Sequence, residues 1–147
     1  MNRTQPHRPA ERVPDWPKIT ATVRPDGTGN LTVNGTERAC QAVTVDQLRA
    51  GMIARCTAIA ARLRRPVRLT VTDDTSTWGL AVRPEGIVQL VDDAGMIPPA
   101  DGLSVHEGRC RHCRRLQPVT QPRCVQCHTE EPHRVDVDPT DAEDTTP

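Results

Sequence analysis

The sequence predicts an α+β fold: a small antiparallel sheet carrying one amphipathic helix, followed by a small C-terminal module built around cysteines. Three observations predict it. Two stretches, Ile19–Arg24 and Val67–Thr72, alternate apolar and polar residues as half-buried strands do. Between them, residues 44–63 carry apolar side chains at helical spacing. Near the C-terminus, four cysteines form two CxxC pairs.

The first part of the sheet is predicted as a hairpin or meander. Ile19–Arg24 is its first strand and runs into Pro25–Gly27, a turn sequence. Leu31–Val33 follows and ends at Asn34–Gly35, a strong signal for a tight turn. Residues 36–43 form the third predicted strand, although their pattern is weak.

The helix is the clearest predicted element. Thr44 is placed to cap its N-terminus, and Gln47, three residues later, completes a capping-box pattern. Pro66 ends it. The positions of one helical face are Leu48, Met52, Cys56, Ile59 and Leu63. This face is predicted to pack on one side of the sheet.

Three strands are predicted after the helix, in an antiparallel run: Val67–Thr72, Trp78–Val82 and Ile87–Val91. The sequence VRPDG at 23–27 recurs as VRPEG at 82–86. Pro at the second turn position and Gly at the fourth favour a type I turn. We interpret the repeat as two hairpins that use the same turn, rather than as a duplicated ligand loop.

Five segments follow from composition. Residues 1–17 are polar and Pro-rich and are expected to be a disordered arm. Residues 18–95 form the α+β body, and 96–105, with Pro98–Pro99, read as a linker. Residues 106–134 contain the CxxC pairs. Residues 135–147 hold five acids and no base, and are expected to be a disordered acidic tail.

Composition excludes several classes of protein. The 147 residues hold 19 Lys and Arg against 19 Asp and Glu, so the chain is not a general polyanion binder. Two Trp, with no Tyr or Phe, cannot form the stacking platform of single-strand nucleic-acid binders. No run of apolar residues is long enough to span a membrane, and the N-terminus has no signal-peptide pattern. We therefore expect a cytoplasmic protein with no membrane partner.

The two CxxC pairs predict a zinc site formed by Cys110, Cys113, Cys124 and Cys127. Two residues between cysteines let one turn direct both sulfurs at the same ion, and the ten intervening residues bring the second pair round. Over residues 106–134 the sequence resembles a zinc ribbon. This resemblance implies a short β-hairpin framework around a structural Zn²⁺. Where zinc ribbons often have glycine after the second cysteine of each pair, this chain has Arg and His, at 114 and 128.

Three other chemistries could use these cysteines. Redox CxxC chemistry needs a pair at a helix start in a βαβ context, which is not visible here. Structural disulfides are disfavoured by the missing secretion signal. The sequence CVQCH at 124–128 matches c-type haem attachment and leaves a haem or redox protein as a remote alternative.

The other histidines and cysteines carry weaker signals. His112 and His128 could replace a cysteine as ligand, but solvent-facing positions are favoured because four thiolates fill the zinc shell. His106 and His133 are expected at the surface. Cys56 lies on the apolar stripe of the helix and is predicted to be a core residue. No role is predicted for Cys40, which lies on the weakly patterned strand 36–43.

The chain is expected not to be an enzyme. It contains no P-loop, GxGxxG, GxSxG or HExxH pattern. Asp73–Asp74 and Asp92–Asp93 are paired acids, but they stand where turns are expected, and turns favour Asp. A zinc ion closed by four thiolates has no open position at which to activate water.

We expect a non-catalytic adaptor whose zinc ribbon provides a rigid platform for a protein partner. The alternative is weak nucleic-acid binding, or regulation, through the Arg-rich ribbon. Its candidate contact residues are Arg109, Arg111, Arg114, Arg115 and Arg123. Residues 104–134 hold six Arg and three Glu, and four thiolates with one Zn²⁺ would reduce their net charge of +3 to about +1. Such a patch predicts only weak, salt-sensitive binding.

Overall fold

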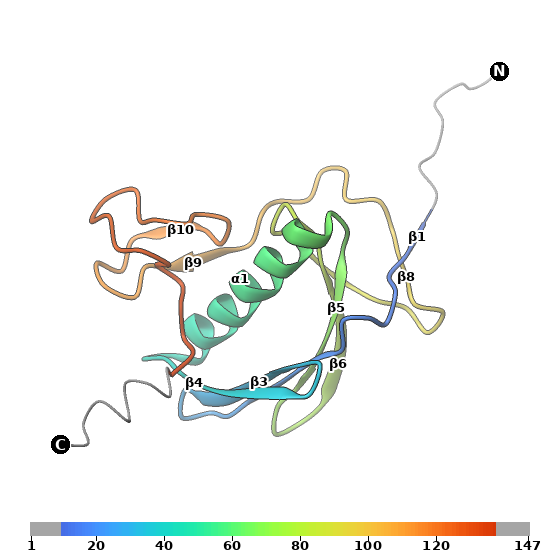
Figure 1. The fold of residues 1–147 in the computed structure, drawn as a ribbon, viewed down its shortest axis with the longest axis horizontal. Helices are drawn as coiled ribbons and strands as arrows, with labels where there is room; N and C mark the ends of the chain where they lie inside the picture. Colours follow the sequence, from blue (N-terminus) through green and yellow to red (C-terminus); the bar gives the residue numbers. More distant parts are fainter. Residues whose placement is uncertain (1–9, 138–147) are drawn as a thin grey trace.

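The computed structural model describes residues 10–137 (Figure 1). Within this range the chain forms one helix and ten strands, which are β1 (Glu11–Arg12), β2 (Ile19–Val23), β3 (Thr28–Val33), β4 (Thr36–Gln41), α1 (Val45–Leu63), β5 (Val67–Thr72), β6 (Thr77–Val82), β7 (Val88–Leu90), β8 (Met96–Ile97), β9 (Glu107–Arg109) and β10 (Leu116–Pro118). The α+β fold class is confirmed.

Six strands form the main sheet, in the order β4-β3-β2-β5-β6-β7. A meander, a helix and a three-stranded antiparallel run follow one another as predicted. One neighbouring pair is parallel: β2 and β5 align Ile19 with Leu69. The physical reason is the connection, because α1 carries the chain back across the sheet so that β5 starts at the same end as β2.

The ends of α1 follow the predicted signals. Thr44 is the N-cap, and its hydroxyl oxygen accepts a hydrogen bond from the Gln47 N–H at 3.1 Å. At the other end, Arg64 takes a left-handed conformation with φ 60° and donates its N–H to the carbonyl of Ala60. Pro66 follows directly and prevents the helix from continuing.

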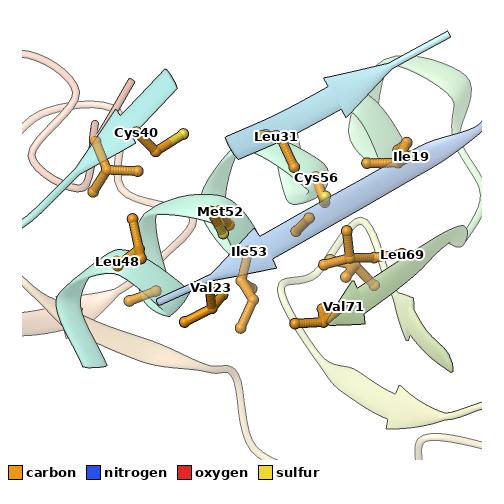
Figure 2. Close-up of a cluster of buried hydrophobic side chains, with 14 of the residues drawn as sticks. Ile19, Val23, Leu31, Cys40, Leu48, Met52, Ile53, Cys56, Leu69 and Val71 are labelled. Carbon is orange, nitrogen blue, oxygen red and sulfur yellow. The ribbon is translucent and has the colours of Figure 1, made fainter. Parts of the chain in front are cut away.

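The predicted stripe of α1 is the core face. Leu48, Met52 and Cys56 are at most 2% exposed and face the strands that carry Ile19 and Leu69 (Figure 2). The other two stripe positions, Ile59 and Leu63, are partly buried against the same core. Burial raises the pKa of the Cys56 thiol to about 12, so it behaves as a small apolar core residue, as predicted.

The repeated turn sequences adopt the same turn. Gly27 and Gly86 both have φ 88°, a left-handed conformation that glycine adopts without strain. The N–H of Gly27 bonds to the carbonyl of Arg24 at 3.2 Å, and that of Gly86 to the carbonyl of Arg83 at 2.8 Å. The repeat therefore reflects shared turn chemistry in two hairpins.

Strand β4 lies at one edge of the sheet, which explains its weak sequence pattern: Cys40 is its one buried residue. Its outer side is partly covered by the start of the segment expected as an acidic tail. Cys40 bridges to Asp136, and the Gln41 N–H donates to the Val135 carbonyl at 2.8 Å. Val135 is buried, so the body recruits residues 135–137, while 138–147 lie outside the described residues.

Part of the expected N-terminal arm is also built into the fold. β1 pairs with β8, which lies in the segment expected as a linker. Val13 is fully buried against Ala81 and Ile97, and its carbonyl accepts a hydrogen bond from Arg68 Nη2 at 2.6 Å. A two-residue strand is too short to give a periodic signal, so the sequence did not reveal it. Residues 1–9 of the arm lie outside the described residues.

Candidate metal centre

The two CxxC segments form the same turn twice. In each, the residue after the second cysteine has a left-handed backbone: φ is 70° at Arg114 and 66° at His128. Each of these residues donates its N–H to the carbonyl of the first cysteine, at 3.1 Å in both turns. The positions where zinc ribbons often have glycine thus adopt the same left-handed geometry with larger side chains.

Backbone N–H groups point at the first sulfur of each pair. His112 N–H donates to Cys110 Sγ at 3.3 Å, and Gln126 N–H donates to Cys124 Sγ at 3.4 Å. Hydrogen bonds from amides favour the charged thiolate over the thiol. Each turn is therefore shaped to present a metal-binding form of its cysteine.

The two turns bring all four predicted ligands together. Their sulfurs lie within 4.8 Å of one another. Cys110 Sγ is 3.7 Å from Cys127 Sγ, and Cys113 Sγ is 3.5 Å from Cys124 Sγ. These separations are far longer than the roughly 2.05 Å of a disulfide, and all four thiols are free. Together the four cysteines could hold a metal ion.

Two neighbours of the cluster were not found from sequence. Gln117 is 2% exposed, and its amide nitrogen lies 3.4 Å from Cys124 Sγ while its carbonyl oxygen accepts from Val125 N–H. The Thr129 hydroxyl lies 3.0 Å from Cys127 Sγ. Thr129 comes two residues after Cys127, but neither Thr129 nor Gln117 belongs to a recognisable sequence motif. Their hydrogen bonds to sulfur depend on how the hairpin folds.

These contacts shift the pKa values of the thiols. The backbone N–H of Cys127, with the Gln117 amide, lowers the pKa of Cys124 to about 7. The hydroxyl of Thr129 lowers the pKa of Cys127 to about 5. The N–H of Arg115 lowers the pKa of Cys113, but burial and bonds to the other sulfurs outweigh it and raise that pKa to about 11. A metal ion that enters this cluster would displace the remaining protons.

The histidines of the two turns are exposed, as predicted. His112 contributes its backbone N–H to a sulfur, and His128 occupies the left-handed position. The CVQCH segment at 124–128 contributes both of its cysteines to the four-sulfur cluster. This arrangement favours metal binding over haem attachment, which would need these two sulfurs for thioether bonds.

The candidate nucleic-acid contacts Arg109, Arg114 and Arg115 are exposed, but each also bonds within the protein. Arg109 donates to the carbonyl of Arg114 at 3.1 Å. Arg114 reaches the side chain of Gln47 on α1 at 3.4 Å, and Arg115 reaches Gln126 at 3.3 Å. Arg114 therefore links the first CxxC turn, at 110–113, to the helix.

The remaining two arginines fasten the second half of the cysteine module. Arg111 donates to the backbone carbonyls of Glu130 and Glu131 at 2.8 and 3.0 Å. Arg123 forms an exposed ion pair with the Glu130 carboxylate. All five arginines thus have hydrogen-bond or ion-pair partners within the described residues.

The cysteine module is packed on the helix, and α1 lies between the sheet and the hairpin β9–β10 (Figure 1). The contact depends on small residues. A Cβ built on Gly108 would lie 2.6 Å from the Ala50 Cβ, and one built on Gly51 would lie 2.4 Å from Val135 Cγ1. The face of α1 opposite the predicted stripe is therefore buried as well.

His133 belongs to this contact, and the prediction that it lies at the surface is wrong. It is 3% exposed, and its Nε2 lies 3.1 Å from the Pro118 carbonyl oxygen. Its Nδ1 is buried without a hydrogen-bond partner among the described residues. Burial lowers the pKa of His133, which favours the neutral imidazole. His106 is half-buried beside it.

Beside this contact, a groove of about 630 Å³ lies between the α+β body and the cysteine module. One wall comes from α1 and β4, with Ala54, Ala58 and Ala61 along the helix. The other wall comes from the cysteine module, including Val119, and from the C-terminal segment that pairs with β4, including Asp136. Neither part alone encloses this groove.

Comparison of the chain with protein-family models, with curated proteins and with solved structures found no match. Among residues 10–137, no helix has the length and apolar character needed to cross a membrane.

Proposed function

We propose that the cysteine cluster is a structural zinc site of the zinc-ribbon type. Tetrahedral zinc with Zn–S bonds of about 2.3 Å requires sulfurs about 3.8 Å apart. The separations of 3.7 and 3.5 Å come close to this value. A thiolate-rich set within two matched turns also suits zinc better than oxygen-seeking cations. Zn²⁺ bound here would hold the two turns together as a fixed charge centre.

The proposed role of this site is structural and non-catalytic. Four cysteines complete a tetrahedral shell, so a bound zinc ion would have no position for a water molecule or a substrate. The polar side chains of Gln117 and Thr129 are engaged with the sulfurs. The residues around the metal are thus arranged for holding it rather than for chemistry.

We infer that the protein acts as an adaptor that holds a segment of a partner protein in the groove. The observation that carries this inference is that the groove has one wall on the body and one on the zinc module. Charged residues line both walls: Arg38 and Arg55 lie on the body side, and Glu130, Glu131, Arg134 and Asp136 on the other. Asp136 pairs with Arg38 at 3.7 Å and with Arg134 at 3.2 Å. A segment bearing both acidic and basic residues would complement these walls.

The alanines of α1 favour a protein partner over a nucleic acid. Ala58 and Ala61 are exposed and leave room for a backbone to approach the helix closely. Weak nucleic-acid binding through the module has less support, because its arginines are engaged by groups such as Glu130 and Gln47. If that alternative held, affinity for DNA or RNA at low salt would fall in Arg111→Ala.

Two measurements test the proposal. Metal analysis of the purified protein should give one zinc per chain, and Cys113→Ser with Cys127→Ser should abolish it. Proteins captured from native lysate are then purified and their affinity for this chain is measured by calorimetry. A genuine partner should bind much more weakly to Ala58→Glu and to the chelated protein, and normally to Ala94→Glu, an exposed alanine outside the groove. Equal binding to both alanine variants would contradict the groove as the site.

A further inference from the structure

The last strand of the main sheet, β7, leaves backbone groups unpaired. Its pairing with β6 uses alternate residues: the Ile87 carbonyl accepts from Arg83 N–H at 2.9 Å, and Val91 N–H donates to Gly79 at 3.0 Å. The alternation of an antiparallel ladder turns the N–H and C=O groups of Val88 and Leu90 away from β6. Within residues 10–137, no hydrogen bond to these outward groups is formed.

The two edges of the sheet differ in their protection. The opposite edge, β4, carries Glu37 and Arg38 and is partly paired with residues 135–137. Charges and covering segments are the usual means by which proteins keep sheet edges from associating. By contrast β7 reads Val-Gln-Leu, has no charge, and leaves Leu90 63% exposed. The edge is therefore apolar and unpaired along Val88–Leu90, whereas just before it the Gly86 carbonyl accepts a hydrogen bond from His106 N–H at 2.9 Å.

We propose that β7 is the interface between two copies of this chain, paired antiparallel about a two-fold axis at Gln89. In this register Val88 lies opposite Leu90 of the partner subunit, and Leu90 lies opposite Val88 of the partner subunit. In each of these two residue pairs, the outward N–H of one residue donates to the outward C=O of the residue opposite. The two pairs together form four hydrogen bonds. The two six-stranded sheets become one continuous sheet.

The side chains of β7 fit this pairing. Val88 and Leu90 lie on the α1 side of the sheet, where they form apolar cross-strand pairs with their counterparts. Gln89 points to the opposite side, where Arg83 Nε bonds its oxygen at 2.6 Å and its amide bonds the Pro98 carbonyl at 2.9 Å. The Gln89 side chain therefore does not enter the proposed interface.

A second copy is favoured over an unrelated partner because the strand is self-complementary: one three-residue sequence supplies both sides. Since β7 itself carries no charge, association should depend little on salt, unlike that of an interface held by ion pairs.

Solution mass measured by light scattering at increasing protein concentration tests the proposal on the metal-loaded chain. We expect a species of twice 16.2 kDa whose share increases with protein concentration. Leu90→Asp should weaken association by about tenfold or more, because it places two carboxylates in an apolar seam. The matched control is Val43→Asp, since Val43 is 67% exposed and lies outside β7. Circular dichroism checks that both variants fold, and Leu90→Thr provides a milder second variant.

Cross-linking tests the register. In Val88→Cys with Leu90→Cys, the paired positions are about 5.5 Å apart between Cα atoms, within reach of a disulfide. Mild oxidation should give a covalent dimer whose linked peptides join position 88 to position 90. A chain that stays monomeric at hundreds of micromolar overturns the proposal. So does a dimer that Leu90→Asp leaves intact.

Discussion

Gly108 of β9 lies so close to Ala50 of α1 that a Cβ on the glycine would stand 2.6 Å from the alanine Cβ. The same added atom would lie 3.1 Å from Nδ1 of the buried His133. Backbone and a small side chain thus form the contact between the cysteine module and the helix. Any enlargement here should separate the two parts.

Gly108→Ala is therefore expected to lower the free energy of unfolding by about 1–3 kcal/mol, because the module cannot move away without opening the buried contact. Chemical denaturation followed by circular dichroism measures this. The matched control is Gly79→Ala in β6, where an added Cβ meets nothing within 4 Å. A loss of stability as large in Gly79→Ala would show that the effect is not specific to this contact.

Metal removal should loosen the helix as well as the cysteine module. Val119 and Val135, on either side of the second CxxC pair, belong to the same core cluster as α1. When the turns lose their ion, we expect faster amide hydrogen exchange in α1 between Gln47 and Thr57, the part that the module covers. The same chelator should leave exchange unchanged in a chain carrying Cys113→Ser and Cys127→Ser. Unchanged exchange in the wild type would mean that the module folds independently.

Gln117 is expected to tune metal affinity through its contact with Cys124 Sγ. Gln117→Leu keeps the side-chain size but removes the donor, and should weaken metal binding about tenfold or more. Competition with a chromophoric chelator measures the affinity. Gln126→Leu is the control, since Gln126 is exposed and donates to sulfur through its backbone only. Equal affinity of wild type and Gln117→Leu would contradict a role for the amide.

His128→Gly should make the metal-loaded protein more stable. His128 holds a φ of 66°, which costs a residue with a Cβ about 1–2 kcal/mol relative to right-handed backbone, and glycine avoids this cost. Thermal unfolding should therefore move to higher temperature. Val125→Gly provides the comparison: Val125 is exposed and has no left-handed backbone, so glycine brings no such gain. A lower unfolding temperature for His128→Gly would contradict this reading of the turn.

Stability should fall as the pH drops below about 6.5. Burial lowers the pKa of His133 and, with a partial opposing effect of Glu107, that of His106 from 6.5. Between the folded and unfolded pKa values the unfolded chain binds more protons, so stability is greatest above 6.5 and decreases with acidification. Denaturant unfolding from pH 7.5 to 5.5 measures the slope. His133→Gln should flatten it; an unchanged slope would assign the effect elsewhere.

The sequence allowed the local elements to be predicted, because their signals are local. Thr44 and Pro66 bracket the helix, and the two turns at Gly27 and Gly86 follow from turn chemistry. The clustering of the four cysteines was predicted for the same reason, since CxxC spacing is a property of one short turn. The structure brings these cysteines together as expected.

The remainder depends on contacts between distant segments. The parallel pairing of β2 with β5 and the return of Val135 to β4 are set by packing across the whole chain, which periodicity does not encode. The second buried face of α1 has the same origin. Ala50 and Gly51 look neutral on a helix, and their importance appears only once another backbone lies against them.

The pairing of residues 135–137 with β4 has a consequence for synthesis on the ribosome. The strand they cover is synthesised before them, and nearly a hundred residues separate β4 from its covering segment. Until that segment leaves the exit tunnel, the nascent body keeps the side of β4 next to Cys40 exposed. Final closure therefore follows the emergence of both ligand turns, so metal capture can precede the last step of folding.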